Sequence, residues 1–187
     1  MSLFVAIRPV EGAIDDLSDA LEPIRRLPAA SALRWQPPSQ WHVTLAFLGD
    51  ADEDVTDEVA ERISDLALTG VPGVRLQGAD CFGRQILWIG IGDDDARRRL
   101  AAVAAAIPPR LRGLGLDVDR RPWRGHLTVA RARTGDARTA ADALAGYQGP
   151  PWDVDELVVI RSTGGPRPAH RVVRTIPLAA PRWVLES

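Results

Sequence analysis

The chain has 187 residues, 45% of them hydrophobic and 26% charged, with a formal net charge of −2 at pH 7. This balance is that of a globular protein with one domain or two small lobes, and it excludes a disordered chain. No apolar run approaches the roughly 20 residues that a membrane-spanning helix needs, so no membrane partner is expected. The N-terminal residues lack the features of a signal peptide, and the lone Cys81 allows no intrachain disulfide. Both observations predict a cytoplasmic location.

Strand-like and helix-like segments alternate in the first half. Residues 3–8 predict a strand, because they are apolar and β-prone and precede Pro9. Residues 11–27 carry apolar side chains at helical spacing and predict a helix that ends before Pro28. Residues 36–39 predict a turn, and residues 41–48 predict a strand. Acidic residues open the next expected helix, 52–68, where they suit the positive end of its dipole.

The second half contains the clearest hairpin signal. Residues 74–82 and 85–91 are two β-prone runs joined through Gly83-Arg84. An Ala-rich helix is expected from the aspartates at 93–95 to residue 107, before two prolines. Residues 126–133 predict a strand, 135–145 a short helix, and 154–161 and 171–176 two strands around a Gly-Pro-rich turn. Hairpins mixed with helices predict an α+β fold rather than a parallel doubly wound sheet, because the hairpin lacks a crossover helix.

Positive charge collects in the second half of the chain. All 23 basic residues are arginine, and six lie between positions 120 and 138 while four lie between 161 and 174. These clusters are candidates for holding an anion, with a solvated arginine-rich face as the equally good alternative.

A short motif occurs twice, 84 residues apart. His42-Val-Thr44-Leu-Ala is nearly repeated as His126-Leu-Thr128-Val-Ala, so both copies read His-apolar-Thr-apolar-Ala. Side chains two apart on a strand share a face, so each copy presents an imidazole and a hydroxyl together. The repeat predicts two similar half-units that bring their motif strands side by side. Duplicated packing without chemistry would produce the same pattern and is the alternative.

Two histidines and two threonines suit phosphoryl displacement. In-line attack at phosphorus needs a base on the entering oxygen and an acid on the departing one, and histidine serves both near neutral pH. Threonine hydroxyls can donate hydrogen bonds to the non-bridging oxygens as their charge develops. No metal or other cofactor is needed for this chemistry, and none is expected.

The paired motifs, quoted as HVTLAFLG from His42 and HLTVAR from His126, resemble the signatures of the two-histidine (2H) phosphoesterases. The most similar branch is the RNA 2′,3′-cyclic phosphodiesterases, historically named 2′-5′ RNA ligases (LigT-like). The opening strand, the stretch from Cys81 to Trp88 and the closing strand with its glycine turn are also similar, so the resemblance covers nearly the whole chain. It implies one bilobed catalytic domain, residues 1–187, with two pseudo-twofold-related antiparallel or mixed sheets, helices outside, and a central cleft carrying both His-x-Thr strands.

The resemblance also implies an activity and residue roles. The expected reaction is metal-independent hydrolysis of a 2′,3′-cyclic phosphate to a 2′-phosphate, with RNA termini or nucleotides as partners and 2′-5′ ligation as the reverse reaction. His126 would be the base and His42 the acid, while Thr44 and Thr128 would grip the phosphate. We expect a monomer with no obligate protein partner.

Two further residues are candidates beyond the motifs. Arg131 ends the second motif and is a candidate phosphate contact, although an ideal strand would point it away from His126. Phe47 is a candidate for stacking on a nucleobase, with core packing as the favoured reading for it and for its tryptophan neighbours. The third histidine, His170, is expected on the surface. The chain departs from the family in having Gly125, where proline often precedes the second histidine.

Rival functions are less well supported by the residues. A metal hydrolase would need ligands clustered near either histidine, and no His-x-x-x-His, Cys-x-x-Cys or Asp-x-Asp accompanies them. A serine or cysteine nucleophile lacks its motif, and Cys81 is expected to be inert packing. A non-catalytic module that binds nucleotides or RNA ends is the alternative from another functional class. It would bind nucleotide without releasing product.

Overall fold

A computed structural model describes residues 1–119, 121–132, 136–163 and 169–180. The strands are β1 (Ser2–Ile7), β2 (Leu33–Trp35), β3 (Val43–Asp50), β4 (Val71–Phe82), β5 (Ile86–Gly92), β6 (His126–Ala132), β7 (Trp152–Val154), β8 (Glu156–Ser162) and β9 (His170–Pro177). The α-helices are α1 (Glu11–Arg25), α2 (Val55–Ser64), α3 (Asp94–Arg110) and α4 (Arg138–Ala143), and short 3-10 turns lie at Pro28–Ala32 and Pro38–Gln40.

The described strands form one curled sheet in the order β7-β4-β5-β6-β3-β1-β8-β9, with β2 paired to β6. All pairs between these strands are antiparallel. The expected α+β class is therefore confirmed, and the two related sheets that were expected are joined here into one continuous sheet. The two halves join because the motif strands β3 and β6 pair with each other, at Val43 and Leu127.

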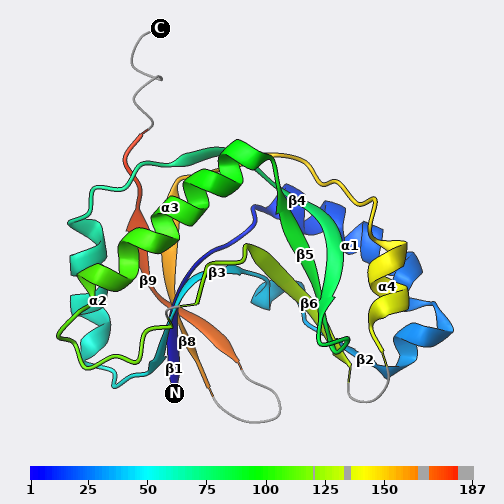
Figure 1. The fold of residues 1–187 in the computed structure, drawn as a ribbon, viewed down its shortest axis with the longest axis horizontal. Coiled ribbons are helices and arrows are strands. Elements are labelled where there is room, and N and C mark those ends of the chain that lie inside the picture. Colours follow the sequence, from blue (N-terminus) through cyan, green and yellow to red (C-terminus); the bar gives the residue numbers. More distant parts are fainter. Residues whose placement is uncertain (120, 133–135, 164–168, 181–187) are drawn as a thin grey trace, which may run out of the picture.

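The order of strands supports two related halves. Outward from the central β3/β6 junction, one half runs β3-β1-β8-β9 and the other runs β6-β5-β4-β7. Figure 1 shows α2 and α4 at opposite ends of the curled sheet and α3 crossing its outer side. The single domain expected for residues 1–187 remains a prediction.

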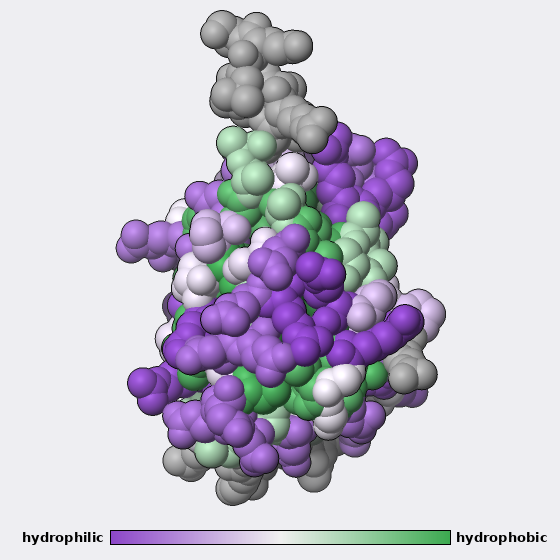
Figure 2. Space-filling view, turned by 90° about the vertical axis from the view of Figure 1, so that its left-hand side faces the viewer, coloured by the Kyte–Doolittle hydropathy of each residue, from purple (hydrophilic) through white to green (hydrophobic). Residues whose placement is uncertain are grey.

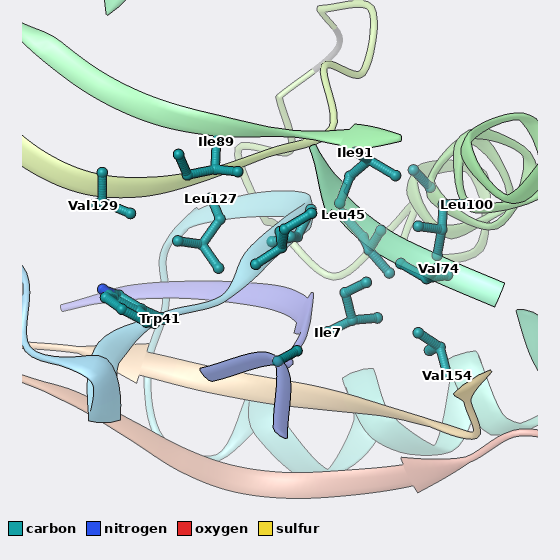
Figure 3. Packing of buried hydrophobic residues seen from close by; sticks show 14 of the residues in the cluster. Ile7, Trp41, Leu45, Val74, Ile89, Ile91, Leu100, Leu127, Val129 and Val154 are labelled. Atoms are coloured by element: carbon teal, nitrogen blue, oxygen red, sulfur yellow. The ribbon is translucent and has the colours of Figure 1, made fainter. Parts of the chain in front are cut away.

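The hydrophobic core lies on the helix-covered face of the central strands. Leu45 of β3, Leu127 of β6 and Ile89 of β5 are buried there, and Leu100 of α3 packs into the same cluster. Figure 3 shows these side chains converging with Ile7 of β1. This packing fixes the faces of both motif strands, because the side chains that alternate with the buried ones must point to the opposite face.

Several element boundaries differ from the sequence expectations. Helix α3 continues through Pro108 and Pro109 to Arg110, so its last turn forms without the two hydrogen bonds that these N–H groups would have donated, and the helix ends directly after them. Strands β2 and β7, of three residues each, were not expected. The Gly-Pro-rich turn after β8 and the beginning of the expected helix 135–145 lie outside the described residues.

The side of the molecule that carries α2 is largely hydrophilic (Figure 2). The acidic residues Asp57, Glu58 and Glu61 of α2 are exposed there, and Arg62 forms an ion pair with Glu58 one turn away. The acidic run is thus a solvated helix face, as its position at a helix start indicated. No helix in the described part of the chain is both long and apolar enough to cross a membrane.

Candidate active site

The pairing of β3 with β6 brings the two motifs together. Val43 lies opposite Leu127, and both are fully buried on the core face. In the antiparallel register set by this pair, His42 faces Thr128 across the strands and Thr44 faces His126. Directly opposite side chains on one face have Cβ atoms about 5 Å apart. All four motif side chains therefore share the face of the sheet that lies away from the core.

Each motif histidine is oriented by the main chain two residues before it. Nδ1 of His42 lies 2.7 Å from the carbonyl oxygen of Gln40, and Nδ1 of His126 lies 2.7 Å from that of Arg124. A carbonyl oxygen only accepts hydrogen bonds, so Nδ1 carries a proton and donates it in both rings. Nε2 of each ring is then left to take or give a proton, as an acid–base pair requires.

Aromatic rings enclose His42. The Phe4 ring stacks on it with centroids 4.9 Å apart, and His170 meets it edge-on at 5.0 Å. His170 also contacts Phe4 at 5.5 Å. His170, which was expected on the surface, is thus half-buried and contacts the first motif histidine. His170 is the first residue of the edge strand β9, three strands away from β3 in the sheet order, so its contact with His42 is made by side chains across the face of the curled sheet.

His126 has aromatic neighbours of its own. The Phe82 ring meets it edge-on at 4.8 Å, and the Trp88 ring lies 6.0 Å away. Both come from the β4–β5 hairpin, where Trp88 pairs with Thr128 across β5 and β6. The stretch from Cys81 to Trp88 is similar to the family named from the motifs, but that similarity did not reveal that the rings contact the histidine.

Burial makes both motif histidines easier to deprotonate. The pKa of His42 falls from 6.5 to about 4, chiefly because the ring is enclosed, with smaller contributions from His170, His126 and Arg8. Burial also lowers the pKa of His126, and the charges of Arg131 and Arg124 act in the same direction. The surroundings of the two rings therefore favour neutral imidazoles near pH 7 and place positive charge around them.

A β-bulge in each motif strand changes which later residues face the site. In β6, Leu87 and Trp88 of β5 pair with Ala130 and Thr128, so Val129 is the extra residue. In β3, Val5 and Ala6 of β1 pair with Ala46 and Thr44, so Leu45 is the extra residue. Each bulge places two successive side chains in the core, Val129 with Ala130 and Leu45 with Ala46. The strict alternation of faces is reset beyond each bulge.

The bulges bring Arg131 and Phe47 to the face of the motif side chains. Arg131 pairs with Ile86, two residues before Trp88 on β5, and therefore shares the face of Thr128. Phe47 pairs with Phe4 and shares the face of Thr44. Phe47 is 42% exposed, so the core packing favoured for it is wrong. Because β3 and β6 are antiparallel, these two residues lie at opposite ends of the site.

Trp123 ties the approach of β6 to β3. Its indole Nε1 donates a 2.8 Å hydrogen bond to the carbonyl oxygen of Thr44. The same ring packs over Gly125, where an added Cβ would lie 2.5 Å from the ring and 3.0 Å from Ile91. Gly125 therefore makes room for the indole, which holds the two motifs in register.

The arginine clusters divide between structure and site. Arg161 is buried and donates to the carbonyl oxygens of Ala51 and Asp52 and to the Thr56 hydroxyl, so it anchors the segment before α2. Arg174 forms an ion pair with Asp57 of α2. The second expected anion-binding cluster is thus largely structural among the residues described, whereas the first one contributes Arg131 to the site.

Neither Cys81 nor a metal cluster stands out as a rival centre. Burial raises the pKa of the Cys81 thiol, which disfavours the reactive thiolate and fits a packing role. In the described ranges, no group of three or more His, Cys, Asp or Glu side chains could hold a metal ion.

Comparison with known proteins identifies the family. Residues 13–166 match the model of the "2'-5' RNA ligase superfamily". The RNA 2′,3′-cyclic phosphodiesterase of Geobacillus stearothermophilus is 28% identical over 89% of this chain, and the match spans 56% of that relative. The enzyme of the same name from Archaeoglobus fulgidus is 28% identical over 71% of this chain and 73% of its own.

A solved structure shares the fold. Apo LigT of E. coli superposes with a TM-score of 0.73 at 18% identity, covering 95% of this chain and 97% of LigT. LigT has also been crystallised with 3′-AMP, and that structure gives a TM-score of 0.72 at 20% identity, with the same coverage of both chains. The chain thus belongs to the 2′-5′ RNA ligase superfamily, a family of enzymes that forms the LigT-like branch of the 2H phosphoesterases.

Proposed function

We propose that this protein hydrolyses RNA 2′,3′-cyclic phosphates to 2′-phosphates without a metal ion, using His42 and His126 as an acid–base pair. One observation carries the proposal. The register of β3 against β6 sets two imidazoles and two hydroxyls on one face, and both Nδ1 atoms are committed to main-chain carbonyls. The names of the relatives, RNA 2′,3′-cyclic phosphodiesterases, support the substrate class.

The reaction needs one base, one acid and stabilisation of charge. The base removes a proton from water, whose oxygen attacks phosphorus. The bond from phosphorus to the 3′ oxygen breaks, the acid protonates that oxygen, and the product carries a 2′-phosphate. Thr44 and Thr128 donate hydrogen bonds to the non-bridging oxygens. The guanidinium of Arg131 adds positive charge from the same face.

We assign the base to His126 and the acid to His42, as the family resemblance implies. Burial sets a condition on this assignment. With a pKa of about 4, His42 is almost entirely neutral at pH 7, so it can act as the acid only when a bound phosphate favours its charged form. Substrate binding and protonation of His42 are therefore coupled in this proposal.

The testing experiment is incubation of the pure protein, in excess EDTA, with a short RNA that ends in a 2′,3′-cyclic phosphate. We expect a 2′-phosphate product from the wild type and at least a hundredfold slower turnover from His42→Ala and from His126→Ala, since general acid or base catalysis contributes about 10²–10⁴ each. Circular dichroism would check that both variants remain folded.

Two results would refute the proposal. Nucleotide binding that raises the thermal unfolding temperature without product would indicate a non-catalytic binding module. Turnover that requires added metal would contradict the two-histidine mechanism, and a 3′-phosphate product would contradict the proposed cleavage of the bond to the 3′ oxygen. Ligation of 2′-5′ ends would use the same site with the 5′ hydroxyl of a second RNA in place of water. That oxygen attacks phosphorus, the bond to the 3′ oxygen breaks, and the acid protonates the 3′ oxygen, so we expect ligation only when 5′-hydroxyl ends are in large excess.

A further inference from the structure

A pair of arginines lies beyond the reacting centre, on the short strand β2. Arg34 is directly opposite Arg131 in the antiparallel pairing of β2 with β6. β2 takes the place of β3 as the partner of β6 past Ala130, so Arg34 lies on the same edge of β6 as the first motif. Figure 1 shows β2 at that end of β6.

Both guanidinium groups belong to the face of the motif histidines. The bulge at Val129 sets Arg131 on this face, and directly paired residues of an antiparallel ladder point their side chains to the same side. The neighbours on either side in β2 agree with this orientation, since Leu33 is buried and Trp35 packs against the core. The two charges thus form a continuation of the site along β6, away from Phe47.

Like charges directly opposite each other on a sheet are destabilising. Partial burial and the charge of Arg34 both lower the pKa of Arg131. The charge of Arg131 also lowers the pKa of both His126 and His170, so this residue lies close to the reacting centre. A bound anion would offset the repulsion, and bidentate phosphate recognition is the chemistry to which arginine is best suited.

We propose that Arg34, with Arg131, forms a second phosphate subsite, which binds the phosphodiester on the 5′ side of the nucleotide that carries the cyclic phosphate. This inference rests on the proposed function and specifies its substrate class as RNA ends rather than mononucleotides. The terminal base lies toward Phe47, the cyclic phosphate lies between the histidines, and the RNA strand leaves over β2.

The test compares three substrates that differ only at the second phosphate. They are a nucleoside 2′,3′-cyclic phosphate, a dinucleotide ending in the same group, and that dinucleotide with a neutral methylphosphonate linkage. Arg34→Ala should lower kcat/KM about tenfold for the charged dinucleotide, as expected for one charge-assisted hydrogen bond. It should leave the other two substrates within about twofold of wild type, which also shows that the variant is folded.

The matched control is Arg97→Ala. Arg97 lies on α3, across the sheet from the site, and its removal changes the net charge equally. It should affect the three substrates alike. Salt dependence gives a second readout with the charged dinucleotide. The slope of log kcat/KM against log salt concentration should be smaller in magnitude by about 0.7 for Arg34→Ala than for wild type, because one phosphate contact to single-stranded RNA is lost.

Three outcomes would overturn the inference. Arg34→Ala slowing all three substrates equally would assign the residue a structural role, and no effect on any of them would mean that Arg34 binds no phosphate. Equal wild-type rates on the charged and neutral dinucleotides would also refute it. Failure of the wild type to hydrolyse even the nucleoside cyclic phosphate would instead count against the proposed function itself.

Discussion

Protonation of His42 on substrate binding is the prediction that follows most directly from the burial of this ring. Charging a histidine with a pKa of about 4 at pH 7 costs about 4 kcal/mol. An imidazolium and a phosphate about 4 Å apart attract by roughly 4 kcal/mol at the effective dielectric constant of a protein surface. The two quantities nearly cancel, so the pKa of His42 in the complex should be near 7.

Isothermal titration calorimetry measures this uptake directly. The His126→Ala variant should bind a nucleoside 2′,3′-cyclic phosphate without turning it over, and this ligand does not itself titrate near neutral pH. Binding enthalpies measured in buffers with different ionisation enthalpies give the number of protons taken up. We expect about half a proton at pH 7 and nearly one at pH 6.

The control is a double variant, His42→Gln with His126→Ala, in which the uptake due to His42 should vanish while any contribution from His170 remains. Normal binding with no proton uptake at pH 6 would refute the reasoning. His42 would then stay neutral in the complex, and the roles of the two histidines would have to be exchanged.

The remaining predictions concern the groups around the histidines. Thr44→Ala and Thr128→Ala should each lower kcat about 10- to 100-fold, less than loss of either histidine, because each removes one hydrogen bond to the developing charge while the other remains; steady-state kinetics measure this. Trp123→Phe should lower the free energy of unfolding by about 1 kcal/mol in urea titrations, because the carbonyl oxygen of Thr44 loses its donor. The folded-state pKa of His42 lies below the unfolded value of 6.5, so its neutral form is favoured by folding and stability falls as the pH drops below 6.5. Unfolding titrations should therefore show a loss of about 3 kcal/mol between pH 7 and pH 4 that His42→Gln does not share. Phe47→Ala should raise KM about tenfold and leave kcat and stability nearly unchanged, because this exposed ring supplies stacking alone; equal losses in kcat would contradict that role.

The chemistry of the site was predictable because it depends on residue types at short spacing. His-x-Thr on a strand fixes a shared face whatever the rest of the fold does, and the repeat implied that the two strands meet. The β4–β5 hairpin was equally accessible, since Gly83 and the flanking β-prone runs are local signals.

Features that depend on pairing between distant segments were not predictable in the same way. The contact of His170 with His42 joins two segments that are far apart in the chain and lie on non-adjacent strands, and the local sequence around His170 carries no trace of it. The position of Trp123 over Gly125 also depends on tertiary contacts. The bulges did leave a signal, two successive apolar residues after each threonine, but alternation was assumed to continue through them.

The bulges also explain how a duplicated scaffold serves an asymmetric substrate. His42, Thr44 and Phe47 occupy the same relative positions as His126, Thr128 and Arg131, and each bulge turns the last residue of its set toward the site. The first two positions are identical in both halves, as expected where a phosphate with paired non-bridging oxygens lies between them. The third position differs, and antiparallel strands carry its two occupants to opposite ends. A ring at one end and a cation at the other are what a terminal nucleotide requires in the proposed function, with its base on one side of the ribose and its 5′ phosphodiester on the other.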